Sequence, residues 1–522
     1  MQDTYDYVII GSGFGGSVSA LRLAEKGYSV LVIEKGKWFT SSDFAKTNWN
    51  LKKWLWLPEL KFFGIQKLNF LRHASVLSGV GVGGGSLVYA NTLPKPKSPF
   101  FGQGSWAGLA DWEQELTPFY ETAWKMLGAS VNPKLAESDL AIQQLAVEIG
   151  KADKFEPTIA AVYFGEPDVT VSDPYFEGKG PERTGCIHCG ACMTGCRHNA
   201  KNTRDKNDLH LAQQLGVSIL AENKVSRVIP KGGNGEKGYE VFFRKSTSWF
   251  SREKKINSKA VIFAGGVLGT VPLLLKLKTT SLPALSDRVG DMLRTNNEAL
   301  IYTTTTNRKL DLHKGIAIGS ILELDENSHL EPVRYGEGSG FWRITMLPMV
   351  SGSNAFFRLA KLFIQPVKAP LTWLKIFFVR DFARSSTVLL FMQHLDSTLK
   401  LRRGMFGTGT RIEKGKAPTP FIPEAHSVAK LFAKIINGKP QIMVNEVIAG
   451  IPSTAHILGG ACMGRDASEG VIDSNNKVFG YENMYIFDGS MISANPGVNP
   501  SLTITAITER GISKIGLKSG KN

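Results

Sequence analysis

Residues 6–36 constrain the fold more strongly than any other part of the chain. They have the pattern strand, glycine-rich turn, helix, strand, and the turn contains G-x-G-x-x-G at Gly11, Gly13 and Gly16. These glycines allow a tight turn, close approach of a pyrophosphate, and close packing of helix on strand. The helix N-terminus offers free N–H groups to the phosphates. Glu34 ends the second strand, where a carboxylate can accept from a ribose hydroxyl. We therefore predict a bound dinucleotide, with a degenerate relic of such a site as the alternative.

The composition is that of a globular protein with a basic surface. The 522 residues are enough for two or more domains, and the hydrophobic fraction of 43% and charged fraction of 21% are ordinary. The net charge of +16 favours contact with anionic surfaces, although it can serve solubility alone. No Arg/Lys array accompanies a recognition motif, so we expect no nucleic-acid partner. Of the anionic partners that the positive charge could favour, we therefore prefer a membrane surface, contacted peripherally.

The cellular location is predicted from what the sequence lacks. The first strand begins at about Thr4, so we expect no secretory signal, and no run of about 18 uncharged apolar residues predicts a spanning helix. Five cysteines in a chain of this length do not suggest a secreted disulfide framework. We expect a cytoplasmic protein that can lie peripherally on the inner face of the membrane.

Two further glycine-rich segments predict close backbone approach to a ligand. Residues 78–91 have the sequence SGVGVGGGSLVYAN, and Gly265 with Gly266 forms a second glycine turn after a buried strand. Such segments make N–H concavities for anions, whereas the alternative for residues 78–91 is a flexible loop.

The C-terminal part contains two candidate catalytic side chains. His456 lies among small residues in STAHILGGACMG, and an imidazole there can take the proton of a substrate hydroxyl. Asn499 and Pro500 are typical of an N-cap and the first helical position, so the helix would direct its positive end towards a ligand. The alternatives are a structural histidine and a simple helix cap.

Residues 296–445 have a different pattern. Residues 303–306, 315–324, 340–346 and 386–393 are predicted as strands without helices regularly between them, which favours a large, mainly antiparallel sheet. Within this region, residues 356–382 are predicted as two short apolar helices with regularly spaced Lys and Arg, broken at Pro366 and Pro370. An interfacial or lid role and an ordinary core helix pair are the two interpretations. Residues 49–63 mix aromatic and basic side chains in a similar way.

Four of the cysteines form a compact motif. Cys186, Cys189, Cys192 and Cys196 have the spacing C-x2-C-x2-C-x3-C, which bacterial ferredoxins use for iron–sulfur clusters. A [4Fe–4S] cluster, a zinc site and structural thiols are the three alternatives. A cluster would give electrons an exit to an external acceptor.

These motifs together resemble the glucose–methanol–choline (GMC) oxidoreductases, and most closely their cholesterol-oxidase-like branch. The segments that carry the resemblance are residues 11–16 with Glu34, residues 83–88, Val225, residues 264–266, His456 and residues 488–510. The resemblance implies an α/β (overall α+β) fold with a Rossmann-like FAD domain built from discontinuous segments. That domain would comprise residues 1–100, 183–295 and 446–522; residues 101–182 would connect it to a substrate domain at 296–445.

The resemblance also implies non-covalent FAD. Glu34 would hold the adenosine ribose, Val225 would meet the adenine through its backbone, and Ser86 would lie near the pyrophosphate or the flavin. The full set of implied FAD-binding residues is Gly11, Gly13, Phe14, Gly15, Gly16, Glu34, Gly83, Gly84, Ser86, Tyr89, Asn91, Val225, Gly265, Asp488, Gly489, Asn499 and Pro500.

The implied reaction is oxidation of an alcohol on a bulky lipophilic substrate, with a 3-hydroxysteroid such as cholesterol as the leading candidate. His456 would take the hydroxyl proton, a hydride would pass to flavin N5, and Asn499 would stabilise the reduced ring. The glutamate that isomerises sterols in this branch has only loose counterparts in Glu323, Glu331 and Glu337. The alternatives are a long-chain fatty-alcohol oxidoreductase, a fatty-acid lyase, and a membrane-associated flavin/iron–sulfur electron carrier.

Overall fold

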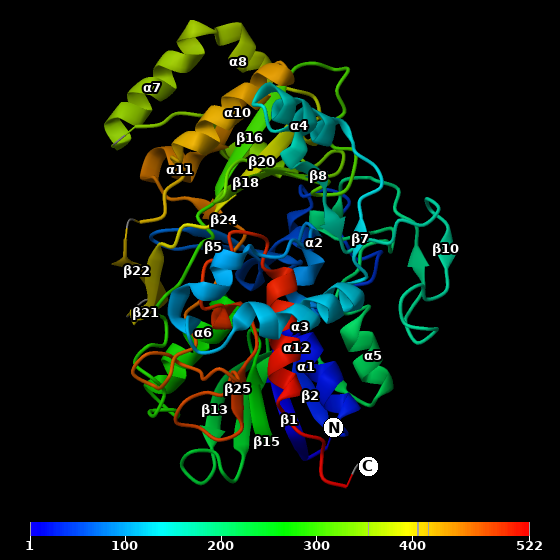
Figure 1. Ribbon diagram of the computed structural model, residues 1–522, viewed down its shortest axis with the longest axis vertical. Helices are drawn as coiled ribbons and strands as arrows, with labels where there is room; N and C mark the ends of the chain where they lie inside the picture. The colour runs from blue at the N-terminus through cyan, green and yellow to red at the C-terminus, as the bar shows by residue number, and fades with distance from the viewer. Residues whose placement is uncertain (1, 353, 405–406, 416, 521–522) are drawn as a thin grey trace.

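Two seven-stranded sheets organise the computed structural model, which describes residues 2–352, 354–404, 407–415 and 417–520. The two sheets lie at opposite ends of the molecule (Figure 1). The chain passes between them several times, so each end is assembled from distant parts of the sequence. This is the mixed α/β fold that the motifs predict.

The first sheet is built around the predicted nucleotide unit. The strand β1 (Thr4–Ile10) pairs in parallel with β2 (Val30–Ile33) on one side and with β15 (Lys254–Phe263) on the other. All four residues of β2 are buried, as expected for a strand covered on both faces. The remaining strands of this sheet are β12 (Ser218–Leu220), β13 (Asn223–Pro230), β14 (Tyr239–Lys245) and β25 (Met484–Ile486).

The first and last long helices of the chain pack against each other. The helix α1 (Phe14–Glu25) lies between α5 (Asp208–Gln214) and α12 (Ser501–Ser513), and α3 (Trp112–Leu127) contacts α12 (Figure 1). Residues 501–512 of α12 are all buried. The N- and C-terminal segments therefore form one unit.

Glycines allow three backbone segments to meet at the start of α1. A Cβ atom on Gly15 would lie 1.8 Å from the carbonyl oxygen of Phe487, and one on Gly16 would lie 2.1 Å from the carbonyl oxygen of Gly11. A Cβ atom on Gly11 would lie 2.4 Å from the carbonyl oxygen of Ala264, and Gly11 has a φ of +106°. Only glycine fits such approaches without moving the backbone.

The second sheet is antiparallel throughout its hydrogen-bonded pairs. Its strands, in spatial order, are β19 (Met346–Pro348), β23 (Gly438–Met443), β16 (Ala299–Thr305), β20 (Ser386–Gln393), β18 (Ser328–Val333), β17 (Ser320–Glu323) and β8 (Phe155–Pro157). Since β8 comes from the segment predicted as a connection, this sheet draws on more of the chain than residues 296–445. The predicted domain boundaries themselves stay a prediction.

The two faces of the second sheet have different neighbours. The helices α4 (Glu137–Glu148) and α10 (Pro423–Ile435) cover one face, where Leu389 and Phe391 of β20 pack with them. Leu390 and Met392 of the same strand point to the other face and join a separate apolar cluster. This alternation, with apolar residues on both faces, explains why β20 has a nearly continuous hydrophobic sequence.

A small sheet connects the two large ones. The strand β6 (Ser75–Gly79) pairs with β5 (Gln66–Phe70) and, in parallel, with β24 (Ser453–Thr454). The strand β6 runs into the second glycine-rich loop, and β24 runs towards His456. This pairing therefore brings two of the predicted functional segments side by side.

Two local expectations are wrong. Residues 340–346 form a 3₁₀ helix, Phe341–Thr345, because Phe341 and Trp342 both pack on Trp54, with ring centroids 5.1 and 5.7 Å away. Consecutive side chains of a strand would point to opposite faces. The break predicted at Pro366 is also absent, because Pro366 lies inside α7 (Ala355–Lys368), and the next helix, α8 (Pro370–Phe377), begins at Pro370. Among the described residues, no helix is both long and apolar enough to span a membrane.

The glycine contacts predict that Gly15→Ala destabilises the protein in the absence of any ligand. The new methyl group would force the start of α1 away from Phe487, and we expect the free energy of unfolding to fall by about 3 kcal/mol. Thermal and urea unfolding of the apoprotein measure this. Gly13→Ala is the matched control, since its Cβ meets nothing within 4 Å and its φ is −72°. Equal stability of both variants would contradict the prediction.

Candidate functional site

The second glycine-rich loop lies directly against the first. A Cβ atom on Gly84 would lie 2.5 Å from the Cα of Gly13. The hydroxyl of Ser12 accepts from the backbone N–H of Gly83 at 3.2 Å and donates to Glu34 at 2.9 Å. The loop therefore covers the turn between β1 and α1 and is not a flexible segment.

Glu34 is buried at the end of β2 and organises its surroundings. Its carboxylate accepts from the backbone N–H groups of Ser12 at 3.1 Å and Gly36 at 2.8 Å. Its backbone carbonyl accepts from Asn223 N–H at 2.8 Å, two residues before Val225. The start of β13 therefore lies beside Glu34, although β13 pairs with β14 and not with β2. The roles of Glu34 at the ribose and of Val225 at the adenine stay predictions.

Three residues of the second loop have different environments. The Ser86 hydroxyl donates to the Gly83 carbonyl at 2.7 Å and accepts from the Arg204 N–H at 3.0 Å, so it fixes the loop. The Tyr89 hydroxyl donates to the backbone carbonyl of Asn202 at 2.6 Å. Asn91 is fully buried with a φ of +62°, and neither amide atom of its side chain has a partner among the described residues.

Asp488 joins the C-terminal segment to the second glycine turn. Its carboxylate accepts from the Gly266 N–H at 2.9 Å, from the Thr270 hydroxyl, and from the N–H of Ser490 at 2.8 Å. Burial raises the pKa of this carboxyl group, although its hydrogen bonds oppose that shift. Gly489 follows directly, so the turn at Gly265 and the segment before α12 are held together.

These segments fit FAD. The N-terminus of α1 has no side-chain cap among the described residues, so its first N–H groups are available to phosphates. The space in front of Gly13 would admit a pyrophosphate, since a Cβ there would meet nothing within 4 Å. The two buried, unpaired amide atoms of Asn91 require a polar partner that the described part of the chain does not supply.

The sequence did not reveal one charged group beside these loops. The guanidinium of Arg204 is fully buried, donates to Asp208 at 2.6 Å and to the Thr505 hydroxyl, and lies 5.1 Å from the ring centroid of Phe14. It connects α12 to the start of α1. A lone Arg in an irregular segment gives no sequence signal of such a contact.

His456 pairs with a carboxylate that the sequence did not indicate. Its Nδ1 atom lies 2.6 Å from Oε2 of Glu298, and the other carboxylate oxygen accepts from the Ala455 N–H. The Glu298 side chain is 1% exposed and that of His456 is 12% exposed. Burial by itself lowers the pKa of His456, but the charges of Glu298 and Glu331 outweigh it, so the pKa is raised above its ordinary value. The hydrogen bond to Glu298 leaves Nε2 for a substrate.

Asn499 lies beside a second buried carboxylate. Its side-chain N–H donates to Oε2 of Glu331 at 3.3 Å, whereas its Oδ1 atom has no partner among the described residues. Within the same described set, Oε1 of Glu331 has no hydrogen-bond partner either, and it lies 3.5 Å from Nε2 of His329. Of the three glutamates considered, Glu323 is half-exposed and Glu337 is exposed, so only Glu331 reaches this site.

The predicted cap at the start of α12 is wrong in detail. The helix begins at Ser501, Pro500 occupies the N-cap, and the side chain of Asn499 makes no capping hydrogen bond to the described helix. The backbone carbonyl of Pro500 accepts from the Ile504 N–H at 2.9 Å, so the proline already has a helical conformation. The amide of Asn499 is thereby left for the site and not consumed by the helix.

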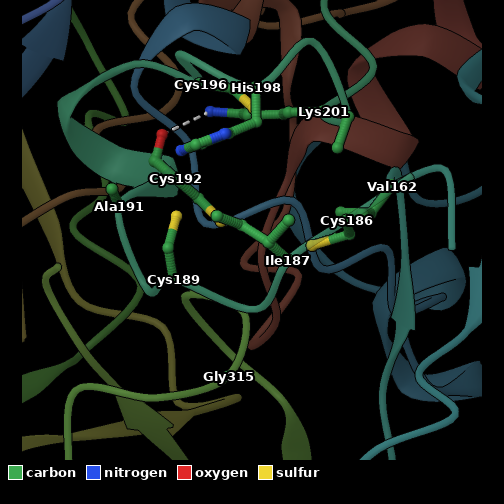
Figure 2. A pocket seen from close by; sticks show the side chains of 11 residues that line it. Val162, Cys186, Ile187, Cys189, Ala191, Cys192, Cys196, His198, Lys201 and Gly315 are labelled. Carbon is green, nitrogen blue, oxygen red and sulfur yellow. Dashed lines mark hydrogen bonds between the residues drawn. The ribbon is translucent and has the colours of Figure 1, made fainter. Parts of the chain in front are cut away.

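The four cysteines line one small cavity but do not form a metal site. Figure 2 shows Cys186 on one side of it and Cys189 and Cys192 on the other. Among the described residues, no group of three or more His, Cys, Asp or Glu side chains is placed to hold a metal ion. Burial raises the pKa of the Cys192 thiol to about 11 and also raises that of Cys186. The predicted iron–sulfur ligands Cys186, Cys189, Cys192 and Cys196 therefore do not fit a [4Fe–4S] cluster.

The cavity has a structural connection to the cofactor loop. The fully buried ammonium of Lys201 donates to the backbone carbonyls of Leu87 at 3.1 Å and Tyr89 at 2.8 Å. It also donates to the backbone carbonyl of Cys192 at 2.9 Å, the bond drawn in Figure 2. Burial lowers the pKa of Lys201 to about 7. The cysteine segment is thus a support for the second glycine-rich loop.

Comparisons with known proteins bear on the family and the fold of this chain. The family models for the N- and C-terminal parts of GMC oxidoreductases match residues 5–277 and 416–508. A cholesterol oxidase from Acinetobacter baumannii is 41% identical over 98% of this chain and 95% of its own length. A long-chain-alcohol oxidase from Arabidopsis thaliana is 26% identical over 96% of this chain and 66% of its own length. The crystal structure of pyridoxine 4-oxidase from Mesorbium loti has a TM-score of 0.61 at 13% identity, covers 98% of both chains, and supports the fold.

The contact between His456 and Glu298 predicts a shift in the pH dependence of activity. A neutral imidazole is needed to accept a proton, so kcat/KM should fall as the pH drops below the raised pKa of His456. Glu298→Gln keeps an acceptor for Nδ1 but removes the charge, so the acidic limb should move to lower pH. A pH series of kcat/KM, with a histidine NMR titration, measures both. Glu323→Gln is the control, and an unmoved limb in Glu298→Gln would refute the assignment.

Proposed function

The chain belongs to the GMC oxidoreductase family and is an alcohol oxidoreductase, and from this premise we propose that it oxidises the 3-hydroxyl group of a steroid such as cholesterol. FAD is the cofactor of this family. The observation that carries the proposal is the pair formed by His456 and Glu298, with Asn499 and Glu331 as its neighbours. The relative at 41% identity, named a cholesterol oxidase, supports the choice of substrate.

His456 is the group that takes the proton of the hydroxyl. Glu298 accepts from Nδ1 and so fixes the tautomer, which leaves the lone pair of Nε2 for the substrate. The buried carboxylate also stabilises the imidazolium that forms when the proton arrives. When bound, FAD supplies the acceptor for the hydride that leaves the carbinol carbon.

Asn499 and the N-terminus of α12 are the polar groups on the other side of the site from His456. The Oδ1 atom of Asn499 is buried and has no partner in the described part of the chain, so it can orient a substrate or cofactor group. The N-terminus of α12 is a positive end, which favours negative charge placed near it. Glu331 holds the Asn499 amide in position through the 3.3 Å hydrogen bond.

A long-chain fatty alcohol is the alternative substrate for the same groups. The plant long-chain-alcohol oxidase is more distant, at 26% identity, and this favours the steroid.

The electron acceptor is a separate question. Because the four cysteines do not fit a cluster, we propose that the electrons do not pass through them and that molecular oxygen is the acceptor. Oxygen consumption during turnover tests that choice, and a flavin that stays reduced in air after the substrate is oxidised would refute it.

The steroid proposal predicts that 3-hydroxysteroids are oxidised with a higher kcat/KM than saturated long-chain alcohols. His456→Asn should lower kcat/KM by about 10² to 10⁴ while FAD remains bound, since a positioned proton acceptor contributes about that factor. Product formation on a substrate panel, with the flavin absorption as a control for cofactor content, measures both effects. A preference for linear alcohols would favour the alternative substrate.

Isomerisation of the oxidised product is a second candidate activity. A 5-ene-3-ketone becomes the conjugated 4-ene-3-ketone when a base removes a proton from C4 and returns it at C6, with no change in oxidation state. Glu331 favours this step, because its carboxylate is fully buried, lies beside Asn499, and has one oxygen without a partner among the described residues.

Glu331→Gln should therefore stop isomerisation and make the 5-ene-3-ketone accumulate. Because the carboxamide oxygen of the variant could still accept from Asn499, that hydrogen bond is kept, and oxidation should fall less than about tenfold, the factor that the loss of a whole hydrogen bond would give. Ultraviolet absorption of the conjugated enone separates the two products. Glu323→Gln is the control. Conjugated product formed at the wild-type rate by Glu331→Gln would exclude Glu331 as the base.

A further inference from the structure

The helices α7 and α8 form an arm, residues 355–378, at the end of the molecule that is distant from the first sheet (Figure 1). The arm packs on α11 (Val444–Ala449) and β19. It belongs to neither the cofactor loops nor the site around His456. Its role is therefore not explained by the chemistry described above.

The helix α7 turns its polar side towards the protein. The buried guanidinium of Arg358 donates to the carbonyls of Val447 at 2.6 Å and Ile448 at 3.2 Å, near the C-terminus of α11. Lys361 and Gln365 also donate to backbone carbonyls of the preceding segment, at 2.7 and 2.9 Å. Residues 358, 361 and 365 have the spacing of one helix face. That face is the one that attaches the arm.

The apolar side of the arm consequently faces the solvent. Phe356 is 74% exposed, Phe363 is 72% exposed and Val367 is 78% exposed. On α8 and at its C-cap, Leu371, Leu374 and Phe378 are 70%, 56% and 76% exposed, whereas Trp373 and Ile376 of α8 are buried. The orientation of α7 is the reverse of a helix that contributes to a core, and so many large exposed apolar side chains on two successive helices mark an interaction site.

The charge of the arm indicates which partner covers its exposed apolar side chains. Residues 355–380 contain five Lys or Arg and no Asp or Glu, and Lys368, Lys375 and Arg380 are exposed. Basic side chains beside large apolar ones match the negative headgroups and acyl boundary of an anionic bilayer. The net charge of +16 adds attraction at longer range.

We propose that the arm docks this protein on anionic membranes, with Phe356, Phe363, Val367 and the apolar residues of α8 inserted into the interfacial layer. The inserted side chains provide the hydrophobic energy of binding, and Lys368, Lys375 and Arg380 pair with headgroup phosphates. The docking is independent of which alcohol the enzyme oxidises, so its test does not depend on the proposed function.

Vesicle flotation of the full-length holoenzyme tests the proposal. Wild type should float with vesicles of phosphatidylcholine and phosphatidylglycerol, float much less with pure phosphatidylcholine, and lose binding as salt is raised. The triple variant Phe356→Ser, Phe363→Ser, Val367→Ser should lose at least about tenfold in binding, given the apolar area removed. Lys368→Glu with Lys375→Glu should abolish the preference for anionic vesicles.

Phe250→Ser is the matched control, because Phe250 is 96% exposed and lies between β14 and β15 in the first sheet. It should bind as wild type does. Unfolding curves and the flavin absorption of the holoenzyme confirm that the variants are folded. Equal binding of wild type and the triple variant would overturn the proposal. So would a wild-type oligomer that the triple variant converts to a monomer without any effect of vesicles, since the arm would then be a protein interface.

Discussion

Direct contact between backbones at the start of α1 is the constraint on which the rest of the structure depends. Gly11, Gly15 and Gly16 allow the turn after β1 to touch Ala264 and Phe487, residues from distant parts of the chain. Because these contacts admit no side chain, they fix the positions of three segments at once. The segment that follows Phe487 leads to Asn499, so the same contacts determine where that segment begins.

The chemistry of the site arises from opposing electrostatic effects. Burial disfavours a charged imidazole at His456, whereas the carboxylates of Glu298 and Glu331 favour it, and the carboxylates prevail. Glu331 lies in β18 of the second sheet, and Glu298 directly precedes β16 of the same sheet. His456 and Asn499 belong to segments that pack on the first sheet. Neither half of the molecule contains the complete site, so the proton chemistry requires the two halves to be held in register.

The sequence pointed to those candidate site residues whose signal is local, and their roles stay predictions. The glycine motif, His456 and Asn499 could be recognised because turns, caps and small neighbouring residues leave patterns within a few positions. Glu298 could not be found, because its contact with His456 joins residues 158 positions apart and neither neighbour carries a signal. The cysteine spacing was misleading for a related reason: spacing allows a cluster, but the fold of the segment does not place three of the described His, Cys, Asp or Glu side chains where they could hold a metal ion. The second sheet was predictable as a class from its strand pattern, although Phe341 and Trp342 show how packing on one partner overrides a local preference.

Arg358 connects the exposed arm to the segment that carries His456. Its guanidinium donates to the carbonyls of Val447 and Ile448 near the end of α11, and the chain then runs through β24 to His456 within a few residues. The arm cannot lift from the body without breaking these hydrogen bonds or pulling on that connection. A displacement of α7 would therefore be transmitted to the backbone between the end of α11 and His456, which also positions the imidazole.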